Sequence, residues 1–275
     1  MITDKFGIQM FSLRASFDAN ARKALEMVAK MGYNGVEVAG LGCLSPDEYK
    51  AICDELGLEI FSAHIGENDL TDEKFAETVA MLNTLGCKRA VLAWIKTPDS
   101  LVSVMDACNR LNKYAEMLSG DGIEFHFHNH DGEMKTLDGE KSILEQLIEG
   151  TSEKVYFELD TGWCNFGGVN SCDIISKYAD RIKLIHLKQI KSMNERITTE
   201  FENGNVIDGK KTYINMVYSG GKGEKICTFI SKKVFPIIIY TAVIMVLLGL
   251  VAMYFSGEKA LTPEKKHSSK HEGEM

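Results

Sequence analysis

Three histidines at alternate positions are the residues of this chain best suited to chemistry. They stand at positions 126, 128 and 130 of the stretch EFHFHNH, residues 124–130. Successive side chains of a β-strand point to opposite faces, so the three imidazoles would share one face and Phe125 and Phe127 the other. Imidazole serves as a metal ligand and as an acid–base group. The spacing therefore predicts the rim of a metal or substrate site, although a single imidazole can also be a core residue.

Two further apolar runs end in groups that bind metals. Asp160 ends the run 155–160, and His186 lies near the end of the run 182–187. Neighbouring strands lie about 4.8 Å apart, so His128, Asp160 and His186 converge if these runs are adjacent strands. Two imidazoles and a carboxylate can hold Mn, Zn, Co, Fe or Mg with positions open to substrate oxygens, so we predict a divalent metal there. A further carboxylate is expected, and a helix N-cap (Asp160) and a core histidine (His186) are the alternatives.

Seven apolar runs, each followed by an amphipathic segment with helical spacing, must position these groups. The predicted strands are residues 7–13, 35–38, 59–64, 89–94, 123–128, 155–160 and 182–187. Strands that alternate with helices predict a parallel sheet, and polar residues at the strand ends are typical of the active-site face of an α/β barrel. An open doubly wound sheet would favour a glycine-rich loop after the first strand, but residues 12–16 (SLRAS) contain no glycine. We therefore predict an α/β fold, a (β/α)8 TIM barrel over residues 1–218.

The β/α pattern weakens towards the end of this barrel. Residues 211–218 could form a helix, and only residues 226–230 (ICTFI) resemble an eighth strand, which we expect to be weak or missing. Residues 219–233 would then be a junction.

The segment 234–255 contains 22 residues without a charge. A helix of that length spans about 33 Å at 1.5 Å per residue, enough for a bilayer core. We predict a single transmembrane helix in preference to a buried core helix, with the barrel in the cytoplasm. Residues 256–275 are polar and are expected to be disordered.

Composition narrows the function classes. The formal net charge is −8, and an acidic chain without a basic cluster in its first 200 residues is a poor candidate for binding nucleic acid. The seven cysteines are scattered and include no CxxC pair, which favours reduced thiols in the cytosol. The N-terminus has no signal-peptide pattern.

An ordered set of motifs resembles the sugar phosphate isomerase/epimerase family, the xylose isomerase-like branch of the TIM barrels, over about residues 5–210. The motifs are GIQMFSLR (7–14), GYNGVE (32–37), FSAH (61–64), HNH (128–130), FELD (157–160) and HLK (186–188). The resemblance implies a divalent metal held by residues of strands five to eight. The ketose epimerases of this superfamily use Glu, Asp, His and Glu in that order. His128, Asp160 and His186 stand at the first three positions, with His128 in place of the first glutamate, and residues 226–230 contain no carboxylate.

The resemblance also implies the remaining site residues. Glu37 and His64 match positions that line the substrate pocket, and either could act as the catalytic base. Lys188 could reach a substrate oxygen or phosphate, so it joins them as a catalytic and substrate-binding candidate. Apart from the resemblance, position in the chain predicts that His130, in the loop after the strand, contacts the substrate and that His126 lies one layer deeper in the core. Trp163, after Asp160-Thr-Gly, is expected to form an apolar wall over the sugar or simply to pack.

The implied function is a metal-dependent isomerase or epimerase that removes a proton beside the carbonyl of a small-molecule sugar, sugar phosphate or polyol. A keto-polyol dehydratase requires the same first step. A membrane-tethered barrel that binds sugar without catalysis, or a degenerate barrel, is the non-enzymatic alternative, supported by the missing carboxylate. An apurinic-site endonuclease is disfavoured because Trp94 and Trp163 stand where histidine ligands would be expected.

Overall fold

The computed structural model describes residues 5–188, 190–192, 195–196, 201–202, 205–206 and 216–219. The chain divides into two units, Met1–Cys227 and Thr228–Met275, and every described residue belongs to the first. The predicted candidate strand 226–230, transmembrane helix 234–255 and tail 256–275 lie outside the described residues. Within the described residues, no helix is long and apolar enough to cross a membrane.

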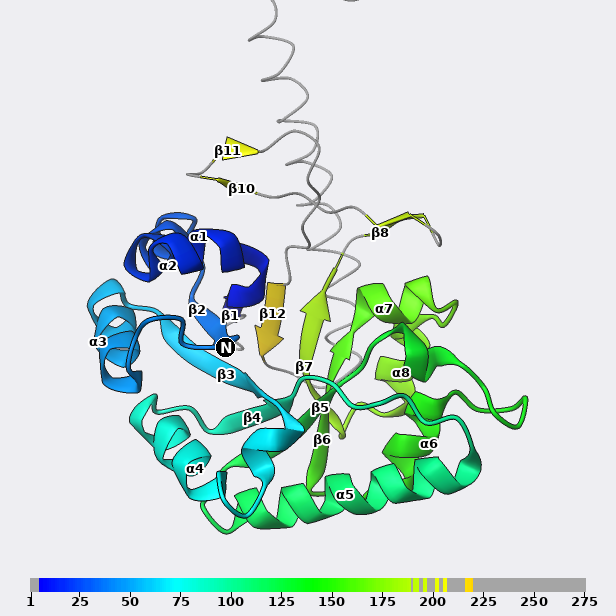
Figure 1. The fold of residues 1–275 in the computed structure, drawn as a ribbon. Helices are drawn as coiled ribbons and strands as arrows, with labels where there is room; N and C mark the ends of the chain where they lie inside the picture. The colour runs from blue at the N-terminus through cyan, green and yellow to red at the C-terminus, as the bar shows by residue number, and fades with distance from the viewer. Residues whose placement is uncertain are drawn as a thin grey trace, which may run out of the picture. The chain divides into compact units, whose positions relative to one another are not determined.

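Eight strands close into a barrel, and helices lie around its outside (Figure 1). The barrel strands are β1 (Lys5–Gln9), β2 (Gly35–Val38), β3 (Glu59–Ile65), β4 (Arg89–Leu92), β5 (Glu124–His128), β6 (Val155–Asp160), β7 (Ile182–Leu187) and β12 (Met216–Ser219). The pairings from β1 through β7 are parallel, which confirms the predicted α/β barrel for the first seven strands.

The eighth strand differs from our prediction. Residues 216–218, which we assigned to a helix, belong to β12, which pairs antiparallel with both β7 and β1. An eighth strand is therefore present, and it is not the one expected at 226–230. The reason is tertiary: β12 fills the gap between two strand edges, and such pairing commonly overrides local preference in a short segment.

Helices cover the barrel between the strands. They are α1 (Arg14–Ala19), α2 (Ala21–Lys30), α3 (Pro46–Leu56), α4 (Phe75–Thr84), α5 (Leu101–Ser119), α6 (Ile143–Gly150), α7 (Thr161–Phe166) and α8 (Ser171–Lys177), with 3-10 turns η1 (Met10–Leu13), η2 (Glu67–Leu70) and η3 (Asp131–Met134). Short strands β8 (Ile190–Ser192), β9 (Glu195–Arg196), β10 (Phe201–Glu202) and β11 (Asn205–Val206) form two small sheets.

Local sequence explains where these helices begin and end. In α3, for example, Ser45 accepts the amide of Glu48, and the Glu48 carboxylate accepts the amide of Ser45. This capping box satisfies two backbone donors that a helix start would otherwise leave unpaired. Gly57 ends the helix with a φ of +68°, a left-handed conformation that glycine adopts without strain.

The strand register determines which side chains meet inside the barrel. His128 on β5 lies opposite Glu158 on β6, and Asp160 lies opposite His186 on β7. An irregularity in the β6–β7 pairing falls between Phe157 and Glu158. Because side chains alternate along a strand, Glu158 and Asp160 point to the same face, two residues apart.

Candidate metal centre

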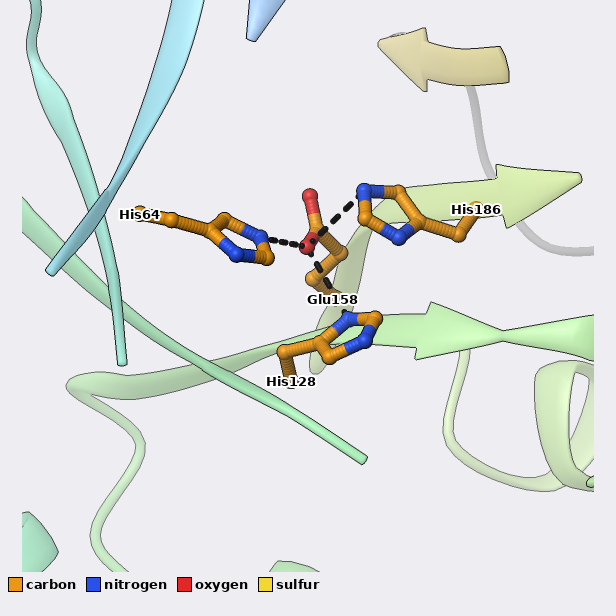
Figure 2. Close-up of side chains that lie close together, drawn as sticks. All are labelled: His64, His128, Glu158 and His186. Atoms are coloured by element: carbon orange, nitrogen blue, oxygen red, sulfur yellow. Dashed lines mark hydrogen bonds and ion pairs between the residues drawn. The ribbon is translucent and has the colours of Figure 1, made fainter. Parts of the chain in front are cut away.

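Four side chains from four strands converge near the carboxyl ends of the barrel strands (Figure 2). They are His64 on β3, His128 on β5, Glu158 on β6 and His186 on β7. Each offers one nitrogen or oxygen atom, and these atoms all lie within 4.8 Å of one another. We call these four residues the deep cluster. It brings together three of the predicted site residues and adds Glu158.

Glu158 is the centre of this deep cluster. Its Oε2 atom lies 2.9 Å from His64 Nε2, 3.1 Å from His128 Nδ1 and 3.1 Å from His186 Nε2. Figure 2 shows the carboxylate between the three imidazole rings. The side chain of Glu158 is fully buried, so its charge requires these partners.

A second buried carboxylate, Glu37 on β2, borders the deep cluster. Glu37 Oε1 lies 2.7 Å from His186 Nε2 and 3.0 Å from His64 Nε2. The hydroxyl of Ser62 donates to the other oxygen, Oε2, at 2.5 Å. Both oxygens of Glu37 therefore have partners. Glu37, which we predicted to line the substrate pocket, contacts two members of the deep cluster, His64 and His186.

The carboxylates determine the charge of two imidazoles. Burial acts to lower the pKa of His64, but Glu37 and Glu158 outweigh it and raise that pKa to about 9. The pKa of His186 is likewise raised well above its ordinary value, because Glu158 and Glu37 outweigh burial. For His128 burial prevails and holds the pKa well below the ordinary value. At neutral pH His64 and His186 are therefore cationic, and His128 is neutral.

Both glutamates are ionised in this environment. Burial and the neighbouring Glu37 act to raise the pKa of Glu158, but the imidazoles, led by His186, bring it to about 2. Burial likewise acts to raise the pKa of Glu37, and the charges of His64 and His186 overcome it and hold that pKa well below the ordinary value.

The donor set fits a divalent transition metal. Three imidazoles and one carboxylate are ligands that Mn, Fe, Co and Zn accept. In the described part of the chain, Glu158 Oε1 is buried and has no hydrogen-bond partner. Native proteins rarely leave such atoms unsatisfied, and a bound ion is one way to satisfy them.

Asp160, which we predicted as a ligand, lies beside the deep cluster and has other partners. Its Oδ1 accepts the amide of Trp163 at 2.9 Å and caps α7, as the alternative interpretation proposed. Its Oδ2 lies 2.6 Å from Lys188 Nζ. The nearest nitrogens of His128 and His186 are 3.8 and 3.7 Å from that oxygen. The three predicted ligands, His128, Asp160 and His186, therefore lie close together in space. The carboxylate of Asp160 forms an ion pair with Lys188.

The remaining predicted residues extend from the deep cluster along the barrel. The His130 ring lies 5.0 Å from the His128 ring and 5.5 Å from the Trp163 ring. Burial, aided by Lys188, lowers the pKa of His130 to about 4, so its imidazole is neutral. Lys188 Nζ lies 4.8 Å from the centre of the Trp163 ring. His126 is fully buried, as expected for a deeper core position.

Sequence reasoning overlooked Glu158. The motif FELD contains the signal, because Glu158 and Asp160 are separated by two and must share a face. We assigned only the residue at the strand end. Glu158 brings a carboxylate from β6 to the predicted imidazoles.

Comparisons with known proteins agree with this barrel. The family model described as xylose isomerase-like TIM barrel matches residues 25–217. The inosose dehydratase of Geobacillus kaustophilus is 26% identical over 196 residues, which cover 62% of each chain. The rhizopine catabolism protein MocC of Rhizobium meliloti is 25% identical over 194 residues, which cover 63% of this chain and 59% of that protein. The chain thus spans about three fifths of the length of these curated relatives.

Solved structures show the same fold. A sugar phosphate isomerase/epimerase from Parabacteroides distasonis superposes with a TM-score of 0.61 at 23% identity, over 68% of this chain and 79% of that one. At this identity the likeness concerns the fold alone. Together with the family match over most of the described barrel, it shows that the chain belongs to the xylose isomerase-like TIM barrel family.

Proposed function

We propose that this protein is a metal-dependent enzyme that removes a proton from the carbon beside the carbonyl of a sugar or keto-polyol. The observation that carries the proposal is the deep cluster: three imidazoles and a buried carboxylate whose donor atoms lie within 4.8 Å of one another. His64, His128, Glu158 and His186 would hold the divalent ion. When bound, the ion would polarise the carbonyl and lower the pKa of the adjacent C–H group.

Glu37 is the best candidate for the base. Its carboxylate is ionised, and it lies next to the deep cluster without belonging to it. In the metal-free protein Ser62 and His186 hold its two oxygens, and a base that is held within reach of the proton it removes is more effective. Glu37 Oε1, between His64 and His186, is the atom that would receive the proton.

Three residues around the cluster would bind the substrate. The neutral His130 ring and the Trp163 ring offer a surface for the apolar face of a sugar or cyclic polyol. The Lys188 ammonium, 2.6 Å from Asp160 Oδ2, is a donor for a substrate oxygen. Substrate contact is the role that the sequence predicted for all three residues.

The product distinguishes an isomerase or epimerase from a dehydratase. Returning a proton on the opposite face requires a second acid–base group, whereas loss of a β-hydroxyl requires an acid near the leaving oxygen. In the described residues, Glu37 is a carboxylate outside the metal set, and the Lys188 ammonium is a candidate acid. A base at Glu37 and an acid at Lys188 would serve a dehydratase, and one curated relative is named inosose dehydratase. We therefore propose a dehydratase as the second candidate function.

The test is an exchange experiment on the full chain loaded with Mn²⁺ or Co²⁺. Ketoses and keto-polyols, including inosose, are incubated in deuterated water, and deuterium at the carbon beside the carbonyl is measured by NMR. We expect incorporation in the wild type and a loss of about 100-fold or more in Glu37→Gln, since a positioned general base contributes about 100- to 10,000-fold. Loss of one water from the substrate would identify the dehydratase, and a new sugar isomer the isomerase or epimerase.

The control is Glu59→Gln, which removes a half-exposed glutamate from the opposite end of β3 and should exchange like the wild type. If no substrate in the panel takes up deuterium and the purified protein retains no stoichiometric divalent metal, the catalytic proposal fails. The non-catalytic sugar-binding barrel is then the better account.

A further inference from the structure

A buried glutamate outside the deep cluster has two uncharged partners. Glu133, in the 3-10 turn η3, is 2% exposed. Its Oε2 accepts the backbone amide of His130 at 2.8 Å, and its Oε1 accepts the hydroxyl of Thr97 at 3.0 Å. Burial raises the pKa of Glu133, and the hydrogen bonds from His130 and Thr97 oppose it only in part. Since burying a carboxylate among uncharged donors is costly, stability alone is a weak explanation for this residue.

The two partners of Glu133 belong to different loops beside the site. Thr97 lies between β4 and α5, and His130 joins β5 to η3. The loops are in direct contact, because a Cβ on Gly132 would lie 2.3 Å from Thr97 Oγ1. Glu133 is therefore a polar link between the β4–α5 loop and the segment that carries His130.

The position of the His130 ring depends on this backbone. Only two torsion angles separate an imidazole ring from its main chain, so a fixed backbone amide restricts where the ring can lie. The His130 ring lies 5.5 Å from the Trp163 ring and 5.0 Å from the His128 ring. A backbone that moved by about 1 Å would change both ring contacts, and displacements of that size are costly in an enzyme site.

We propose that Glu133 is a positioning residue, which holds the backbone of His130 and ties it through Thr97 to the β4–α5 loop, so that the His130 imidazole stays beside Trp163. Glu133 acts through His130 and does not touch the substrate. The consequence for substrate binding rests on the proposed function, whereas the effect on the ring does not.

The alternative is that Glu133 only caps η3. Glu48 illustrates such a role, because its Oε2 accepts the amide of Ser45 at 2.8 Å at the exposed start of α3. A glutamate that only caps contributes stability and leaves the rings of the site where they are. Glu48→Ala is therefore the matched control, since it removes a bond of the same kind and length.

The first test uses NMR of the full chain without substrate, with and without diamagnetic Zn²⁺. The readout is the nuclear Overhauser effect between the ring protons of His130 and Trp163. We expect this signal in the wild type and in Glu48→Ala, and its loss in Glu133→Ala. Glu133→Gln should retain it, because the amide oxygen can accept from His130 and the amide group can donate to the Thr97 hydroxyl.

The second test uses KM and kcat for inosose, or for the member of the exchange panel that reacts. We expect Glu133→Ala to raise KM about tenfold and to change kcat less than about threefold, because a contact made equally in the ground and transition states affects KM alone. In a His130→Ala background the same substitution should raise KM less than about twofold, since the residue through which it acts is gone.

A second pair of variants covers the case in which Glu133→Ala does not fold, as judged by circular dichroism. Thr97→Val removes the hydroxyl that donates to Glu133 Oε1, so it should weaken the His130–Trp163 signal and raise KM, and Thr97→Ser should restore both.

A His130–Trp163 signal that persists in Glu133→Ala or, if that variant is unfolded, in Thr97→Val would overturn the inference and leave Glu133 as a cap. An equal rise in KM with and without the His130 side chain would also overturn it. The proposed function fails separately, if no substrate in the panel takes up deuterium, and the NMR comparison then still decides whether Glu133 positions His130.

Discussion

Replacing Glu158 by glutamine tests the electrostatic account of the deep cluster without any substrate. The protein environment brings the pKa of Glu158 from its ordinary value of 4.5 to about 2. At 1.36 kcal/mol for each tenfold change in proton affinity, this corresponds to about 3 kcal/mol of folding stability at neutral pH. The side chain is fully buried, so solvent does not screen the interaction.

We therefore expect metal-free Glu158→Gln to lose about 3 kcal/mol in its free energy of unfolding, a decrease in Tm of about 10 °C for a domain of this size. The assay is urea unfolding at pH 7 with a chelator present, followed by the fluorescence of Trp94 and Trp163. The sign of the pH dependence follows from the lowered pKa. The contribution of Glu158 is complete above pH 4.5 and is lost as the pH falls towards 2, so wild type and variant should converge in acid.

Glu124→Gln is the matched control. The pKa of Glu124 is also lowered to about 2, by its hydrogen bond with His126 and its contacts with Lys183 against the effect of burial. Its side chain is 39% exposed, however, so solvent screening should reduce the loss to less than about 1 kcal/mol. The reasoning is refuted if Glu158→Gln unfolds within 1 kcal/mol of the wild type, or if the two variants lose the same amount.

Three further predictions address the barrel and the base. A Cβ on Gly35 would lie 2.2 Å from the carbonyl oxygen of Glu59, so Gly35→Ala should lower the free energy of unfolding by about 3 kcal/mol. In the control, Gly120→Ala, the new Cβ would meet nothing closer than 3.4 Å, and the free energy of unfolding should change by less than about 1 kcal/mol. Chemical denaturation measures both values. Ser62→Ala removes the donor to Glu37 Oε2, so the pKa of Glu37 should rise and the acid limb of kcat/KM should move to higher pH; an unchanged limb would exclude Glu37 as the base. Adding Co²⁺ at about 100 times its Kd should stabilise the wild type by about 2.7 kcal/mol, and Glu158→Gln at the same Co²⁺ concentration by much less, as measured by the shift in the urea midpoint.

The sequence predicted the barrel well because its signals are local. Apolar runs, helix caps such as Ser45 and terminating glycines such as Gly57 identify elements without knowledge of their partners. The predicted secondary structure was wrong for two segments whose conformation depends on contacts with distant parts of the chain. Residues 10–13, expected to continue the first strand, form the 3-10 turn η1, and the β12 strand at 216–219 depends on the free edges of β1 and β7.

The candidate site shows the same division between local and non-local information. Alternation in β5 and β6 puts His128, Glu158 and Asp160 inside the barrel, and this much follows from sequence. The sequence does not show whether Glu158 or Asp160 lies in contact with the imidazoles. That depends on the β6–β7 irregularity and on Lys188, which pairs with Asp160 and follows the end of β7.

Charge balance connects the metal-free site with the proposed metal-bound one. Three carboxylates, on Glu37, Glu158 and Asp160, face the ammonium of Lys188 and two imidazolium groups, on His64 and His186. The six charges sum to zero, which allows a largely buried cluster to exist without an ion. A divalent ion bound to neutral imidazoles would replace the two protons and leave the sum unchanged. The same carboxylates that keep His64 and His186 protonated in the free protein can therefore compensate a metal, and for this reason both states are compatible with one fold.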